Sequence, residues 1–89
     1  MTGAPVPDRE GLARIVREAV SDVLGTEPED IHETTDLKGD FDIDSLELMD
    51  IGARLEAVLR VGIPVSDLTG AATVGEAIDV LLGRLERHA

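Results

Sequence analysis

Ser45 is the residue whose setting in the sequence best suits covalent chemistry. It follows Asp44, a favourable N-cap residue, and Glu47 stands three positions after that aspartate. This is the spacing of a capping box, with Asp in the place of the usual Ser or Thr. Ser45 is therefore expected at the first helical position, with its hydroxyl exposed. A phosphate ester there would lie beside unpaired N–H groups and the positive end of the helix dipole, which both favour an anion.

A metal site is one alternative for this stretch. Asp40, Asp42 and Asp44 match the first three ligand positions of an EF-hand loop. The glycine position of such a loop would be Ser45, however, and the position of the bidentate glutamate would be Ile51. The sequence therefore excludes an EF-hand and predicts no metal site, leaving only weak divalent binding by the aspartates.

A serine hydrolase is a second alternative. Ser45 does not lie in a G-x-S-x-G motif, and the histidines are limited to His32 and His88. The chain shows no strand pattern that could build a cleft-forming sheet, so we do not expect an enzyme. A third possibility is a carrier, in which an exposed serine is modified and then holds a cargo without any catalytic group of its own.

Acidic residues are concentrated around this serine. The chain has 19 acidic and 8 basic residues, a formal net charge of -11. Between Glu27 and Asp50 there are ten acids and one base, Lys38, which gives a local net charge of -9. Such a field repels nucleic acid and anionic membranes and steers basic protein surfaces toward it. The alternative is a solvated loop that only adds solubility.

Length and composition indicate one small domain. The chain has 89 residues and no cysteine, which rules out a disulfide framework and a nucleophilic thiol. No apolar run approaches the ~20 residues of a membrane span, and no basic segment followed by an apolar one marks a secretory signal. We therefore expect a cytoplasmic monomer. Residues 1–7 contain two prolines and a glycine and are predicted to be a disordered lead-in to a domain at 8–89.

Hydrophobic periodicity predicts an all-α fold, a small bundle of three long helices and one short helix. The first helix is expected after Asp8, with Gly25 as its stop. A long connection, 26–43, follows, and its apolar residues Ile31, Leu37 and Phe41 are expected to pin it to the core. The remaining predictions are a helix from Ser45 to about Val61 that Gly62 ends, a short turn of helix at 66–70, and a last helix opened by a capping box at Thr73 and Glu76.

The predicted second helix carries two apolar rows. The wide row should face the core and consists of Leu48, Ile51, Leu55, Val58 and Leu59. The narrow row consists of Leu46, Met49 and Ala53 and is interleaved with acidic residues. A helix with one core stripe does not need the second row, so we interpret it as a protein-docking surface. The alternative is that Leu46 and Met49 also pack in the core.

The order of these features resembles acyl carrier proteins over residues 8–86. The resemblance depends on Asp44-Ser45-Leu46 at the start of an acidic helix, with the long loop before it and Gly62-Ile63-Pro64 after it. It implies that Ser45 receives 4′-phosphopantetheine from coenzyme A through a phosphopantetheinyl transferase. The terminal thiol of that arm would hold an acyl group as a thioester.

The resemblance also implies a docking surface for partner enzymes. The basic patches of acyl-loading and condensing enzymes would meet a set of carboxylates: Asp44, Glu47, Asp50 and Glu56. Leu46 and Met49 would supply the apolar contact. Three departures from the family pattern stand out: Asp42 occupies the place of the usual glycine, the short third helix has one charge, Asp67, and Ala53 is a small residue in the docking row.

The type of carrier is less closely specified. The Gly-Gly-x-Ser pattern of peptidyl carriers is missing, which favours an acyl or polyketide carrier. The positions of Met1 and of the last helix predict a free-standing protein. Fatty acid synthesis, polyketide synthesis and aminoacyl or peptidyl carriage all remain open. The alternative from another class is an acidic helical adaptor that binds a basic partner and is never modified.

Overall fold

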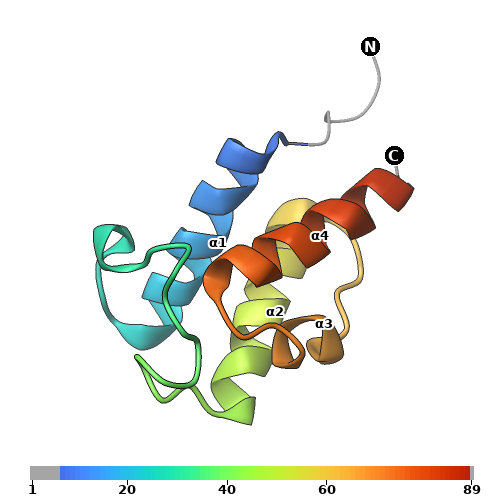
Figure 1. The fold of residues 1–89 in the computed structure, drawn as a ribbon. Helices are drawn as coiled ribbons and strands as arrows, with labels where there is room; N and C mark the ends of the chain where they lie inside the picture. Colours follow the sequence, from blue (N-terminus) through green and yellow to red (C-terminus); the bar gives the residue numbers. More distant parts are fainter. Residues whose placement is uncertain (1–6, 89) are drawn as a thin grey trace.

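Four α-helices form within residues 7–88, the part of the chain that the computed structural model describes. They are α1 (Arg9–Leu24), α2 (Ser45–Leu59), α3 (Val65–Thr69) and α4 (Val74–His88), and a short 3₁₀ helix, η1 (Pro28–Asp30), lies between α1 and α2 (Figure 1). The prediction of an all-α bundle with one short helix is confirmed. Residues 1–6 of the predicted lead-in lie outside the described residues.

The ends of α1 are fixed by local signals. The Asp8 carboxylate accepts a hydrogen bond from the Gly11 N–H at 2.8 Å and so caps the first turn. Gly25 ends the helix in the left-handed conformation, with a φ of 75°. Both residues act as the sequence predicts.

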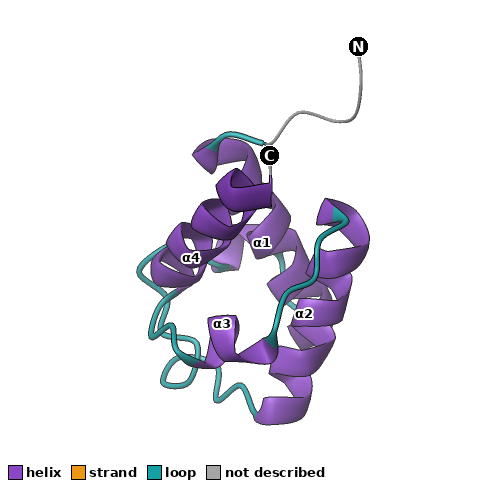
Figure 2. Cartoon of the chain, turned by 90° about the vertical axis from the view of Figure 1, so that its right-hand side faces the viewer, coloured by secondary structure: helices purple, strands orange, loops and turns teal. Residues whose placement is uncertain are grey.

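The core lies where α1 packs against α2 and α4, and α3 closes the bundle by packing against α2 and α4 (Figure 2). Gly52 of α2 is buried where α3 approaches, and a Cβ atom there would lie 3.5 Å from the Leu68 side chain. The most deeply buried large side chains come from α1, α2, α4 and the connection: Leu12, Val16, Val20, Ile31, Ile51, Leu55, Val74, Ile78 and Leu81.

The connection between α1 and α2 is held against the domain. Ile31 and Leu37 are buried and Phe41 is half-buried against the core, as the sequence predicts. The connection also pairs with the start of α4 through three backbone N–H to O=C bonds of 2.8–3.1 Å: Leu37 to Ala72, Val74 to Thr35, and Gly75 to Glu33. The chain ahead of Ser45 is therefore fixed to α4 as well as to the core.

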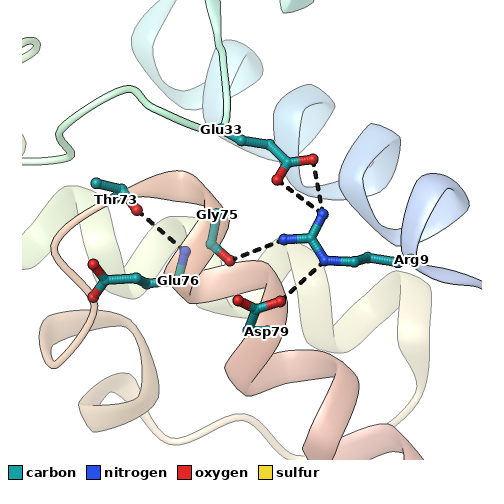
Figure 3. A network of polar contacts seen from close by, with 6 residues as sticks. All are labelled: Arg9, Glu33, Thr73, Gly75, Glu76 and Asp79. Atoms are coloured by element: carbon teal, nitrogen blue, oxygen red, sulfur yellow. Dashed lines mark hydrogen bonds and ion pairs between the residues drawn. The ribbon is translucent and has the colours of Figure 1, made fainter.

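A polar network joins the same elements at the surface. The Arg9 guanidinium of α1 donates to the Glu33 carboxylate of the connection at 2.8 and 2.9 Å and to the Asp79 carboxylate of α4 at 3.0 Å (Figure 3). The hydrogen bonds to Glu33, which have the larger effect, and to Asp79 raise the pKa of Arg9. The network links α1, the connection and α4 at one place.

The start of α4 agrees with the prediction in part. The Glu76 N–H donates to the Thr73 hydroxyl at 3.2 Å, so Thr73 caps the helix (Figure 3). The Glu76 carboxylate accepts from the N–H of Ala72 at 3.2 Å, one residue before the position that a complete capping box would use.

The end of α2 departs from the prediction. The helix stops at Leu59 rather than near Val61, and Arg60, not Gly62, closes it in the left-handed conformation with a φ of 62°. Val58, predicted to face the core, is 61% exposed. It lines an open groove together with residues of α1, among them Ile15 and Ala19.

Candidate functional site

The capping box predicted at the start of α2 is present. The Glu47 N–H donates to the Asp44 carboxylate at 2.8 Å, and the Asp44 N–H donates to the Glu47 carboxylate at 3.1 Å. Ser45 is consequently the first helical residue, and it is exposed. Two reciprocal hydrogen bonds fix the backbone on both sides of its hydroxyl group.

The first turn of α2 leaves donors for an anion. Asp44 takes the Glu47 N–H through its side chain and the Leu48 N–H through its carbonyl, the latter at 3.0 Å. In the described part of the chain, the N–H groups of Ser45 and Leu46 form no such bond, as is usual for the first positions of a helix. These two groups and the positive end of the helix dipole would favour a phosphate ester at the serine.

The loop before Ser45 is ordered by its own aspartates. The Asp36 carboxylate accepts the N–H groups of Gly39 at 2.8 Å and Lys38 at 3.0 Å, and these hydrogen bonds lower the pKa of Asp36. The Asp40 carboxylate accepts the Asp36 N–H at 2.9 Å. Ile43 is buried and anchors the last part of the loop. The approach to Ser45 is therefore held from within the loop and from the core.

Asp42 has a backbone conformation that the sequence alone did not predict. Its φ is 52°, in the left-handed region that favours glycine. Aspartate is among the non-glycine residues that adopt this region most readily. The departure from the family's usual glycine at this place was the signal that could have revealed it.

The narrow apolar row of α2 is exposed. Leu46 is 74% exposed and Met49 is 55% exposed, and Ala53 also faces solvent. The alternative that Leu46 and Met49 pack in the core is wrong. These side chains start beside Ser45 and continue along the outer surface of α2.

The carboxylates predicted to dock partners all lie on α2 or its cap: Asp44, Glu47, Asp50 and Glu56. Three of them also hold the fold. Asp44 and Glu47 form the capping box, and the Glu56 carboxylate accepts the Ile63 N–H at 2.6 Å. Asp50 is exposed and lies 3.5 Å from Arg54 on the same helix. The structure thus places the predicted acidic and apolar residues along one helix, and it adds structural roles that the sequence did not reveal.

The one charged residue of α3 is turned toward α4. Two hydrogen bonds, of 2.5 and 3.2 Å, join the Arg84 guanidinium to the Asp67 carboxylate, and the two side chains are 25% and 14% exposed. The bond to Asp67 raises the pKa of Arg84. The acidic surface beside Ser45 therefore comes from α2 and the loop before it rather than from α3.

Two further features bear on what the described part of the chain can do. No group of three or more histidine, cysteine, aspartate or glutamate residues is arranged to hold a metal ion there. In residues 7–88, none of the helices has the length and apolar character needed to cross a membrane.

Comparison with known proteins identifies similar chains. Residues 14–81, which include Ser45 and the whole of α2, match a family model described as "Phosphopantetheine attachment site". The meromycolate extension acyl carrier protein of Mycobacterium tuberculosis is 38% identical over 74 residues, which cover 83% of this chain and 64% of that protein. The acyl carrier protein of Saccharopolyspora erythraea is 30% identical over 82 residues, covering 92% of this chain and 86% of that protein.

Proposed function

Because the chain belongs to the acyl carrier protein family, we propose that Ser45 is the residue to which 4′-phosphopantetheine is attached. The observation that carries the proposal is the placement of Ser45. It is exposed, it is the first residue of α2, and reciprocal hydrogen bonds between Asp44 and Glu47 fix its backbone. The N–H groups of Ser45 and Leu46 suit the phosphodiester that attachment would create.

The sequence is consistent with a reactive thiol that comes from the attached arm rather than from the protein. The bound arm supplies a terminal thiol that holds an acyl group as a thioester, and the chain itself has no cysteine. Its own residues hold the attachment point in a defined position and present it to other proteins. Acyl carrier proteins are generally non-catalytic, and we infer that the bond-forming chemistry here belongs to the partner enzymes.

The surface of α2 supports docking to enzymes with basic patches. Leu46 and Met49 offer apolar contact beside Ser45, and the carboxylates around them steer a positively charged surface toward the serine. The proposed partners are a phosphopantetheinyl transferase and enzymes that load or condense acyl groups. Since Asp67 of α3 is paired with Arg84, we assign the attractive charge to α2 and its preceding loop.

The relatives favour an acyl cargo. The name of the mycobacterial relatives refers to meromycolate extension, and this chain covers 64% of the length of the one from Mycobacterium tuberculosis. We propose that the cargo is a growing fatty acyl or polyketide chain rather than an aminoacyl group. We assign the choice between these two cargoes to the partner enzymes.

Intact-mass spectrometry tests the attachment. The purified protein is incubated with coenzyme A and, in separate samples, with phosphopantetheinyl transferases of the two broad classes, beside a Ser45→Ala variant. We expect a gain of one phosphopantetheine in the native protein and none in the variant. No gain with either transferase, on protein shown to be folded, would refute the proposal and favour an unmodified acidic adaptor.

A further inference from the structure

A groove between α1 and α2 lies far from the proposed attachment site. It has a volume of about 310 Å³ and reaches Val58, near the C-terminal end of α2. At a rise of 1.5 Å per residue, Val58 is about 20 Å along the helix axis from Ser45. The groove is therefore a separate surface from the apolar row beside the serine.

The floor of the groove is aliphatic. It is formed by Ile15 and Ala19 of α1 and by Ala57 and Val58 of α2. Val58 is 61% exposed and Ala57 also faces solvent. Ile15 is partly buried and Ala19 is buried, so the exposed apolar surface of the groove comes from Ala57 and Val58, which are adjacent on α2. The two alanines leave the space that larger side chains would fill, so the groove can receive an aliphatic side chain from outside.

The rim of the groove carries more negative than positive charge. Glu18 and Asp22 of α1 line it, and Arg54 of α2 is the cation opposite them. Arg54 lies 3.9 Å from Asp22 and 3.5 Å from Asp50, and all three side chains are about half exposed or more. Ion pairs this long and this exposed contribute little stability. An incoming basic group can therefore pair with Glu18 and displace Arg54 from Asp22.

We propose that this groove binds an amphipathic helix of a partner protein, with aliphatic residues on one face and basic residues beside them. A helix fits because the groove lies between two helices, whose ridges accept the side chains of a third. The groove offers no strand edge, since the backbone groups of α1 and α2 around it are engaged within their own helices. This second surface would hold a partner while the Ser45 end of α2 stays accessible.

A designed peptide tests the groove without any coenzyme A or transferase. The probe is a stapled helical peptide with two leucines four residues apart and an arginine on either side of that face. Two-dimensional NMR of the labelled protein should show peptide-dependent shifts at Ile15, Ala19 and Val58 rather than at Leu46 and Met49. Peptides with alanine for leucine, or glutamate for arginine, should bind at least tenfold more weakly.

Two matched variants separate groove binding from general attraction to an acidic protein. Val58→Lys and Met49→Lys add the same charge at exposed positions of the same helix. We expect Val58→Lys to weaken peptide binding about tenfold and Met49→Lys to leave it within about twofold. Equal weakening by both variants, shifts centred on Met49, or no binding at millimolar peptide would each overturn the proposal. Dilution-dependent shifts at the groove in the free protein would also overturn it, because a second copy would then be the occupant.

Discussion

The two ends of α2 are closed by different means. At the N-terminal end, Asp44 and Glu47 exchange hydrogen bonds and hold Ser45 between them. At the C-terminal end, Arg60 takes a left-handed conformation, and the Glu56 carboxylate turns to accept the Ile63 N–H. The cap that holds the proposed attachment site is therefore made by reciprocal hydrogen bonds, whereas the residue that caps the opposite end is itself left-handed. At the N-terminal end the left-handed residue, Asp42, lies outside the cap.

This comparison shows that the acidic residues of α2 do more than supply charge. Asp44, Glu47 and Glu56 each accept a backbone N–H, so removing one of them changes the fold as well as the surface. Asp50 accepts no backbone N–H from residues 7–88 and interacts with Arg54. Variants meant to test partner binding should therefore use Asp50, or should keep a hydrogen-bond acceptor at the other positions.

The largest effect on stability is expected at the N-terminal end. Asp44→Ala removes the acceptor for the Glu47 N–H and a negative charge beside the helix dipole. Loss of an N-cap costs about 1 kcal/mol, and the lost charge adds several tenths, so we expect a decrease of about 1–2 kcal/mol in the free energy of unfolding. Urea denaturation followed by circular dichroism measures it.

Asp44→Asn is the matched control. It keeps an oxygen acceptor and removes only the charge, so its loss should be about 0.3–1 kcal/mol. Equal losses for Asp44→Ala and Asp44→Asn would mean that the hydrogen bond at this end contributes nothing and that the comparison between the two ends is mistaken.

A gain in stability is expected at the C-terminal end. Arg60→Gly removes the steric cost of the left-handed conformation, which stabilises the folded state by about 1–2 kcal/mol. The greater chain entropy of glycine in the unfolded state offsets about 0.5–1 kcal/mol of that gain. The net gain should be about 0.5–1 kcal/mol by the same denaturation measurement. A loss of stability would show that the Arg60 side chain makes a contribution larger than this strain.

Two other left-handed positions calibrate that result. Gly25→Ala, at the C-cap of α1, should destabilise the protein, because the backbone is left-handed there. No neighbouring atom lies within 4 Å of the added Cβ, so the loss measures the backbone strain alone. Asp42→Gly, on the other side of α2, should give a smaller gain than Arg60→Gly, because aspartate tolerates this conformation better than arginine.

The sequence predicted those parts of the fold that depend on nearby residues. Asp8, Gly25 and the Asp44–Glu47 pair act at helix ends through neighbours three or four positions away. The exposure of Val58 depends on which α1 side chains lie beside it, and periodicity along α2 cannot supply that information. The sequence also predicts the end of α2 two residues too late, because glycine is a more common helix stop than arginine and Gly62 lies just beyond Arg60.

Long-range pairing was equally hidden from the sequence. The bridge between Asp36 and Thr73 joins residues far apart in the chain, and no local motif marks it. For the site, the exposed position of Ser45 and the exposure of Leu46 and Met49 followed from spacing. The hydrogen bond between Glu56 and Ile63 and the ion pair between Asp67 and Arg84 could not be predicted from spacing, since both depend on how neighbouring elements pack.

The smallest effect is expected in the loop that leads to the N-terminal end of α2, and it depends on pH. Hydrogen bonds from the Gly39 and Lys38 N–H groups lower the pKa of Asp36. Because the folded-state pKa lies below the ordinary value of about 4, the contribution of Asp36 to stability is complete above that value. It is lost as the pH falls through the lowered pKa, when the carboxylate takes up a proton.

Asp36→Asn isolates this contribution from those of the other acids. In the native protein one carboxylate oxygen accepts both N–H groups, and the amide oxygen of asparagine can do the same. The amide carries no charge and does not titrate, so the variant should be less stable than the native protein at neutral pH. The difference between their unfolding free energies should be constant from pH 7 to about 5 and should shrink below about 4. A difference that stays the same down to pH 2 would mean that the charge of Asp36 does not hold the loop. The order at the N-terminal end of α2 would then come from the capping box and from the backbone pairing of the connection with α4.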